Sequence, residues 1–169
     1  MNNESKITTV TSICVIILRE LRVERGYHQA QVADWLGKTP SAWTKVEAGK
    51  SPLQFEAFIR VCNGMAVMSS AVMATAERYA WVLFQNGWAI VSTELDSAED
   101  GLLGQAQEYW ASPGGRSVGS NRWGFNSILN GPIHGLNSTV NIAPVFQFAL
   151  DPAFRQSQLN YQPVASNGF

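Results

Sequence analysis

Residues 18–67 read LRELRVERGYHQAQVADWLGKTPSAWTKVEAGKSPLQFEAFIRVCNGMAV, and apolar residues recur through this stretch at helical spacing. Gly37 and Gly49 interrupt the pattern at short intervals, and glycine commonly ends a helix because it tolerates a positive φ. Thr39-Pro40 is a helix start, since a hydroxyl N-cap precedes a proline at the first helical position, where a missing N–H costs nothing. The stretch therefore predicts short helices in close succession.

Five helices are predicted in the first half of the chain. They cover residues 12–26, Gln29–Leu36, 40–48, a segment opened by Ser51-Pro52, and Ser69–Gln85. Their expected core side chains lie mostly three or four residues apart: Leu18, Leu21, Val32, Ala33, Leu36, Trp43, Val46, Phe55, Phe58, Ile59, Cys62, Val72, Met73, Ala76, Ala80 and Leu83. Five helices in about 75 residues, with few residues between the second and the third, are the layout of a compact helix-turn-helix domain.

The second half of the chain predicts a small α+β domain at residues 87–163. Its expected elements are a strand at 88–95, a helix at 96–111, a glycine- and serine-rich loop at 112–124, and a strand at 138–150 that Pro144 interrupts. Its aromatic residues are expected to form a core together with a dimer contact, or alternatively a ligand pocket: Trp88, Tyr109, Trp110, Trp123, Phe125, Phe146, Phe148 and Phe154.

The predicted fold class is thus a mainly α N-terminal five-helix helix-turn-helix domain followed by a small α+β domain. Residues 12–68 would be the helix-turn-helix domain and 69–86 a connecting or dimerisation helix. The terminal segments, 1–11 and 164–169, are expected to be flexible.

The composition is that of a globular protein, with 46% hydrophobic and 15% charged residues in 169, and a net charge of −1. Positive charge is concentrated toward the front. Residues 1–67 carry eight Lys or Arg against six Asp or Glu, whereas residues 68–169 carry four against seven. A nucleic-acid binder of this composition must gather its positive charge on one face.

Several classes of function are not expected. No lysine follows Lys50, so the second half lacks the lysine base that a self-cleaving serine domain needs. His134 is the only histidine there, which argues against a metal site, and no phosphate-binding glycine pattern occurs. We expect no enzyme activity, no cofactor and no metal. Cys14 and Cys62 are expected to be buried, reduced thiols, and the absence of a signal peptide or membrane span predicts a cytoplasmic protein.

The quoted stretch resembles the Cro/CI-type (XRE) helix-turn-helix family of DNA-binding proteins. The features that carry the resemblance are Leu18, Leu21, Arg22, Gly26, Gln29, Val32, Ala33, Leu36, Gly37, Val46, Glu47 and Gly49, followed by a fourth helix of suitable length. The resemblance covers roughly a third of the chain and implies binding to double-stranded DNA through the helix at 40–48.

The spacing of the third helix puts Trp43 and Val46 in the core and leaves the opposite face free for the major groove. By resemblance, Ser41 and Lys45 read base edges with Thr44 and Pro40 beside them, and lysine suits the paired acceptors of guanine. The resemblance also assigns backbone phosphates to Gln29, His28, Thr39 and Lys50. Arg22 and Glu47 would form a structural ion pair between the first and third helices.

Some residues depart from the family pattern. Lys38 replaces an apolar residue, Trp43 is larger than the usual β-branched residue, and Leu53 takes a place where proline is common. Ala48 offers no polar contact. With few strong base readers, sequence specificity is expected to be modest or to depend partly on DNA shape.

These observations predict a DNA-binding transcriptional regulator that acts as a repressor and forms a homodimer or higher homo-oligomer. The helix at 69–86, with Met73, Tyr79, Trp81 and Leu83, would either provide the dimer interface or connect to the second half. That half would dimerise or sense a small-molecule or protein effector. The alternative is an antitoxin-type protein, whose second half binds a protein partner while the first half regulates its own promoter.

Overall fold

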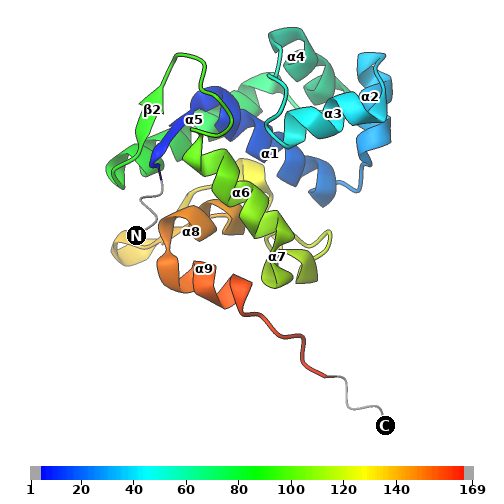
Figure 1. Ribbon diagram of the computed structural model, residues 1–169. Helices are drawn as coiled ribbons and strands as arrows, with labels where there is room; N and C mark the ends of the chain where they lie inside the picture. Colours follow the sequence, from blue (N-terminus) through cyan, green and yellow to red (C-terminus); the bar gives the residue numbers. More distant parts are fainter. Residues whose placement is uncertain (1–4, 166–169) are drawn as a thin grey trace.

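The computed structural model describes residues 5–165, and its first half is a series of five α-helices (Figure 1). They are α1 (Val10–Glu24), α2 (Gln29–Leu36), α3 (Pro40–Glu47), α4 (Phe55–Gly64) and α5 (Ser69–Gln85). The second half contains α6 (Gly101–Ala111), α7 (Pro113–Ser117), α8 (Pro144–Leu150), α9 (Pro152–Leu159) and the 3-10 turns η1 (Ile128–Asn130) and η2 (Leu136–Ser138). The mainly α fold with a small second part containing short strands is confirmed.

Two pairs of very short strands complete the described chain. β1 (Ile7–Thr9) pairs in parallel with β2 (Ala89–Val91), and β3 (Ile133–His134) pairs antiparallel with β4 (Val140–Asn141). The prediction that residues 1–11 are flexible is therefore wrong for residues 7–11, because the ladder to β2 and the first turn of α1 order them. Residues 1–4 lie outside the described part of the chain, as do 166–169 of the predicted flexible tail.

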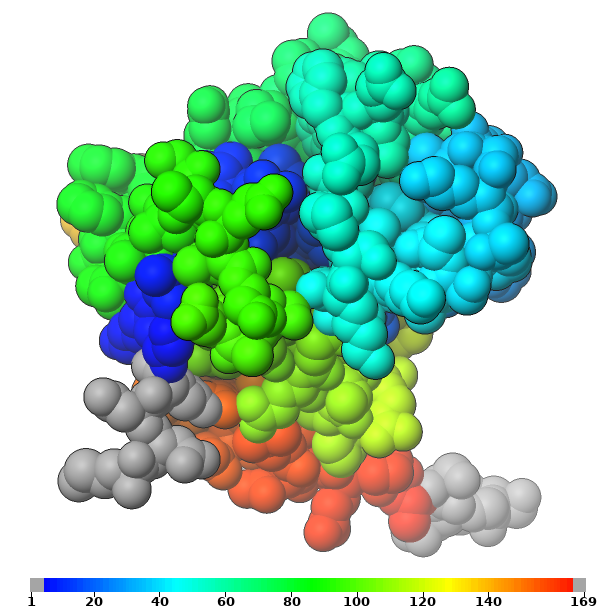
Figure 2. All heavy atoms as spheres, turned by 45° about the horizontal axis from the view of Figure 1, so that its top comes forward, coloured from blue at the N-terminus to red at the C-terminus, as the bar shows by residue number. Residues whose placement is uncertain are grey.

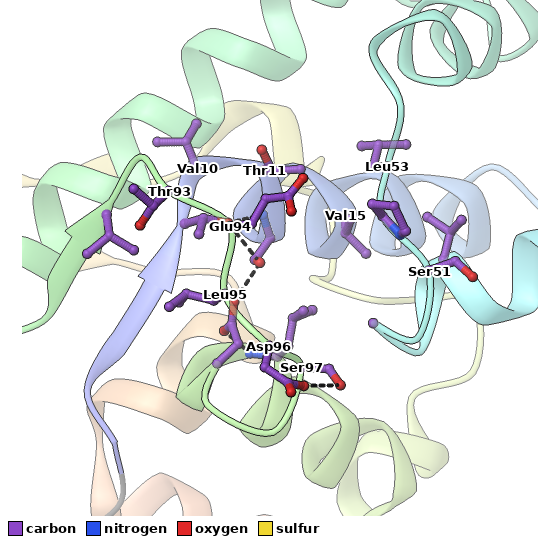
Figure 3. A pocket seen from close by; sticks show the side chains of 18 of the residues that line it. Val10, Thr11, Val15, Ser51, Leu53, Thr93, Glu94, Leu95, Asp96 and Ser97 are labelled. Atoms are coloured by element: carbon purple, nitrogen blue, oxygen red, sulfur yellow. Dashed lines mark hydrogen bonds between the residues drawn. The ribbon is translucent and has the colours of Figure 1, made fainter.

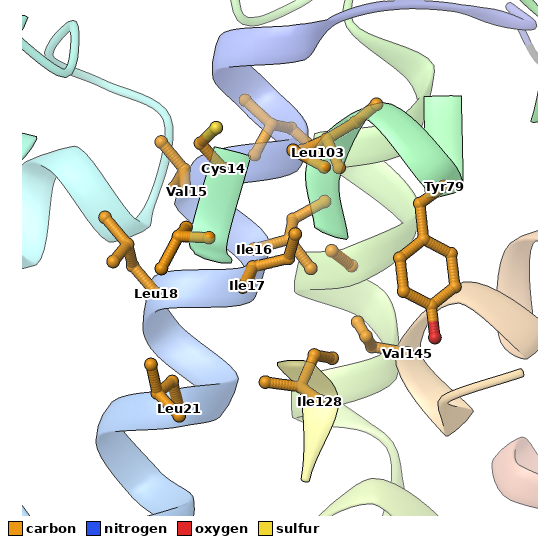
Figure 4. Close-up of a cluster of buried hydrophobic side chains, with 14 of the residues drawn as sticks. Cys14, Val15, Ile16, Ile17, Leu18, Leu21, Tyr79, Leu103, Ile128 and Val145 are labelled. Carbon is orange, nitrogen blue, oxygen red and sulfur yellow. The ribbon is translucent and has the colours of Figure 1, made fainter. Parts of the chain in front are cut away.

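Helix α1 lies among the other helices near the middle of the molecule (Figure 1), and it carries many of the side chains in a buried apolar cluster (Figure 4). Ile13, Ile16, Ile17, Leu18 and Leu21 are fully buried, and the helix contacts α3, α5, α6 and η1. The hydrophobic core formed around it runs without a break from the first half into the second. Both halves of the chain therefore depend on the same helix for their packing.

The first half follows its predicted helices closely, with one displaced start. α4 begins at Phe55 rather than at Ser51-Pro52, because residues 51–54 form an extended connection whose Leu53 packs against the core. Phe55 is consequently 72% exposed at the start of the helix, and the prediction that it lies in the core is wrong. Met73 and Ala80 are only partly buried.

The second half differs more from its prediction. The strand at 88–95 shortens to β2, and Asp100 starts α6 by accepting a hydrogen bond from the Leu103 amide. The strand predicted at 138–150 is wrong: only Val140–Asn141 is extended, and Pro144 occupies the first turn of α8. The loop predicted at 112–124 contains α7.

Most of the aromatic residues of this half are buried in the core, as expected, although Phe125 is fully exposed and Trp123 and Phe154 are partly buried. The two thiols, Cys14 and Cys62, are free and buried, which confirms their predicted state. Between residues 5 and 165, no single helix is long and apolar enough to cross a membrane. Only α4 and α5 taken together, bent by 114° at their junction, meet that length and composition.

Candidate nucleic-acid interface

The turn between α2 and α3 sets the position of α3. Gly37 adopts φ 64°, a left-handed conformation that glycine accepts without strain, and its N–H donates to the carbonyl of Asp34. The Lys38 amide then donates to the carbonyl of Ala33 at 3.0 Å, which closes the end of α2. Ala33 is fully buried, as expected of a small residue between two closely packed helices. The chain thus reverses direction within a few residues and presents α3 beside α2.

The two sides of α3 differ sharply. Trp43 is 1% exposed on the inner side. Pro40, Ser41, Thr44 and Lys45 are all exposed to solvent on the outer side. No other element of the described chain covers that outer side. All four residues that the sequence assigns to base reading are therefore free to approach a duplex.

Glu47 joins α3 to its neighbours through a buried carboxylate, and the ion pair expected with Arg22 is present. The Arg22 guanidinium donates to it through Nε and Nη2, the latter at 3.0 Å, and also through Nη1 to the carbonyl of Tyr27. The indole N–H of Trp43 donates to the same carboxylate at 2.8 Å. This bond explains how the oversized Trp43 fits, because a buried indole needs an acceptor for its N–H.

Gln29 lies where α2 and α3 meet, and its side chain contacts protein groups. Its Nε2 donates to Glu47 at 2.6 Å, while its Oε1 accepts from the hydroxyl of Thr44 at 3.0 Å. The Thr44 hydroxyl also lies 3.1 Å from the carbonyl of Pro40. A phosphate at this position would therefore be bound mainly by the backbone N–H groups that open α2.

The other residues assigned to phosphates lie on the rim of the same face. His28, Thr39 and Lys50 are exposed. The His28 amide donates to the Gln31 side chain, and the Thr39 hydroxyl lies 3.1 Å from that of Ser41. Between Gln29 and Lys50, four charged residues are exposed. Three are the lysines Lys38, Lys45 and Lys50, and the fourth is Asp34. The face is positive although the whole chain is not, which suits a phosphate backbone.

One support for α3 could not be found in the sequence. Gln107 of α6 donates from Nε2 to the backbone carbonyl of Glu47 at 2.8 Å. The end of α3 is therefore attached to the second half of the chain. Glutamine on a helix carries no signal for such a contact, because the two residues lie 60 positions apart.

Within residues 5–165, no group of three His, Cys, Asp or Glu side chains could hold a metal ion. A family model described as a helix-turn-helix domain matches residues 16–75, from the first half of α1 to the first half of α5. No curated protein and no solved structure matches the chain.

Proposed function

We propose that the protein, whose residues 16–75 match a helix-turn-helix domain, is a sequence-specific transcriptional regulator that acts as a repressor and reads the major groove with α3. The observation that carries the proposal is the contrast between the two sides of α3. Trp43 and Glu47 fix one side in the core, while Ser41, Thr44 and Lys45 stand exposed on the other. A rigid helix with a free polar edge is what groove reading requires.

Base recognition is assigned to the outer edge of α3. Lys45 donates to the O6 and N7 acceptors of a guanine, and Ser41 donates to or accepts from a neighbouring base. Pro40 supplies an apolar contact for a thymine methyl group. Thr44 has a smaller role, because its hydroxyl is already engaged with Gln29 and Pro40.

Positioning on the duplex is assigned to the rim of this face. Lys50 and His28 pair with phosphates as charged or polar side chains, and Gln29 and Thr39 lie at the openings of α2 and α3, whose N–H groups suit an anion. The salt dependence of binding follows from these contacts, with log affinity falling linearly with log salt at roughly −0.9 per phosphate neutralised.

The protein is proposed to act as a homodimer, because one helix-turn-helix contacts only about half of an operator. The structure changes the interface assigned to α5, since Tyr79 and Leu83 are fully buried and cannot contact a second copy. Trp81 keeps its proposed place in the interface, and Phe84 is added beside it. Each is 60% exposed, and their rings stack with centroids 5.7 Å apart on the outer side of α5. An exposed aromatic pair of this kind is typical of an interface.

The decisive experiment is selection of bound sequences from random duplex DNA, followed by affinity measurements on the selected site. Lys45→Ala should weaken binding to that site by about 1–3 kcal/mol and relax the preference at one base pair. Arg60→Ala is the matched control, because Arg60 is an exposed cation on α4, away from the outer edge of α3. Equal losses on selected and random DNA would assign Lys45 to a phosphate, and no enrichment of any sequence would overturn the proposal.

A further inference from the structure

A cavity of about 690 Å³ lies between the two halves of the chain, away from the outer edge of α3. Figure 2 shows it as a hollow whose floor is α1, with residues 90–97 on one side and the connection from α3 to α4 on the other. Its volume falls in the range of small-molecule sites, which is about 300–1,000 Å³.

The cavity has apolar walls on several sides (Figure 3). Val10 and Val15 come from α1, Leu53 from the connection between α3 and α4, and Leu95 and Leu103 from the opposite side. None of these side chains belongs to the DNA-reading edge. They can enclose the apolar body of a ligand.

The charges around the cavity are unbalanced. Glu94 and Asp96 line the wall opposite the α3–α4 connection, and Asp100, which precedes α6, also lines the cavity and is 3% exposed. Lys50 is the one cation among the lining residues. Between residues 5 and 165, no Lys, Arg or His forms an ion pair with any of these three carboxylates.

The buried carboxylate is held by neutral donors. Asp100 accepts hydrogen bonds from the hydroxyls of Thr8 at 2.9 Å and Ser12 at 2.6 Å, and from the Leu103 amide at 3.0 Å. All three donors are uncharged, so no cation of the described residues pairs with this carboxylate. In a partly enclosed site the field of such a charge is screened less than on an open surface.

We propose that this cavity binds a small amphipathic cation, an organic molecule with an apolar body and an ammonium or comparable positive group. The cationic group lies between Glu94 and Asp96, and the apolar body lies against Val15 and Leu53. An anion would be repelled by the carboxylates. An inorganic cation would leave the apolar walls unused, and the cavity has no cluster that could hold a metal ion in the described residues.

The position of the cavity connects this ligand to DNA binding, an inference that rests on the proposed function. Val46 of α3, Gly49 and Lys50 all line it, so an occupant contacts the end of the reading helix and a phosphate-binding lysine. Gly49 packs closely on α6: a Cβ there would lie 3.0 Å from the Leu103 side chain. A ligand between these walls therefore changes the position of the α3–α4 connection and the affinity for DNA.

The test uses three probes with the same apolar body: 4-phenylbutylamine, 4-phenylbutanol and 4-phenylbutyrate. Each is titrated into the full chain while backbone amide NMR signals are followed, without DNA. The amine should perturb residues 10–15, 49–54 and 92–97 in a saturable way, with a dissociation constant at least about tenfold lower than those of the other two. The double variant Glu94→Gln/Asp96→Asn should remove the preference for the amine.

Glu99→Gln is the matched control, because Glu99 is an exposed carboxylate of the same loop that does not line the cavity. It should leave the preference unchanged. Equal binding of the three probes, or perturbation centred on Trp81 and Phe84 instead, would overturn the proposal.

A second measurement tests the connection to DNA. Saturating amine should change the affinity for a selected duplex several-fold in the original chain and not in Glu94→Gln/Asp96→Asn. If the amine binds and DNA affinity is unchanged, the connection is wrong while the site stands. If the protein binds no DNA at all, the proposed function fails and the cavity result is unaffected.

Discussion

Helix α1 carries one half of each of two buried ion pairs, and the two are built alike. On one side, Arg22 pairs with Glu47 of α3, whose carboxylate also accepts the Trp43 indole N–H. On the other side, Glu20 pairs with Arg122, and its carboxylate also accepts the Trp110 indole N–H at 2.6 Å. In both clusters an arginine donates two hydrogen bonds to a carboxylate, and a tryptophan indole N–H donates a further one to it.

The clusters differ in what they join. Arg22 and Glu47 lie 25 residues apart within the helix-turn-helix region, whereas Glu20 and Arg122 lie 102 residues apart and join α1 to the segment before η1. The same arrangement of arginine, glutamate and tryptophan therefore occurs twice. One cluster orients α3, and the other attaches the second half of the chain to α1. Variants in the two clusters should therefore separate DNA binding from the cohesion of the molecule.

The largest effect is expected at Glu47. Glu47→Gln leaves the Arg22 guanidinium buried without its counterion and should lower the free energy of unfolding by about 3–5 kcal/mol, measured by urea denaturation. DNA affinity should fall with it, because α3 loses its anchor. The double variant Arg22→Met/Glu47→Gln removes both charges but keeps an amide oxygen that can accept the Trp43 indole N–H, and it should recover much of the stability. A loss below about 1 kcal/mol for Glu47→Gln would contradict this account of the cluster.

Glu20→Gln should have the next largest effect, about 3 kcal/mol, since its carboxylate accepts from two partner side chains and not three. Hydrogen exchange should rise in α6 and in the segment around Arg122, because their attachment to α1 is weakened. DNA affinity at a temperature where the variant is folded should change little. Loss of DNA binding equal to that of Glu47→Gln would show that the two clusters do not act separately.

A smaller effect is expected from Gln29→Ala, which removes one neutral donor from Glu47 and the acceptor of Thr44. Stability should fall by about 1 kcal/mol. Under the proposed function, binding to selected and random duplexes should weaken alike, because the Gln29 side chain supports α3 and the phosphate-facing start of α2 and contacts no base. A loss confined to the selected sequence would instead make Gln29 a base reader.

The buried thiols and phenols should have the smallest effect on stability at neutral pH, and their effect should appear only at high pH. Burial raises the pKa of Cys14 to about 12, that of Cys62 to about 11, and those of Tyr79 and Tyr109 to about 12. The unfolded chain releases these protons at its ordinary, lower pKa values, so above about pH 9 the native state holds more protons than the unfolded state.

Stability should therefore be unaffected by these groups below about pH 9 and should fall as pH rises toward 12. Thiolate absorbance reports on Cys14 and Cys62 in the first half, and tyrosinate absorbance includes Tyr109 in the second. The thiolate absorbance of the two cysteines and the tyrosinate absorbance of the buried tyrosines should rise at the same pH at which the protein unfolds. Thiolate formation near the ordinary value of 9.0 in the folded protein would contradict the burial of these side chains.

Local signals in the sequence were sufficient for most of the first half. Gly37 and Thr39-Pro40 define the turn between α2 and α3, and the α2 bounds match their prediction. A capping residue followed by proline also precedes α7, as Ser112-Pro113, and α9, as Asp151-Pro152, and both pairs indicate a helix start. The strand predicted at 138–150 rests on a run without charged residues that is rich in Val, Ile and Phe, a composition that a short buried helix shares; Pro144 fits the first turn of such a helix.

The remaining features depend on contacts between distant residues. The Arg22–Glu47 pair came from a family resemblance and not from spacing. Nothing near Glu20 indicates Arg122, and a strand of three residues such as β1 is recognisable only with its parallel partner β2. The cavity likewise exists only once residues 90–97 lie opposite the α3–α4 connection.

Because α1 is covered by α5 on one side and by α6 and η1 on another, it cannot be separated cleanly with the DNA-reading helices. A fragment that ends at residue 86 would expose to water the apolar side of α1 that α6 covers in the full chain. It would also lose β2, and with it the parallel pairing to β1. Transferring the helix-turn-helix region to another protein would thus require transferring nearly the whole molecule.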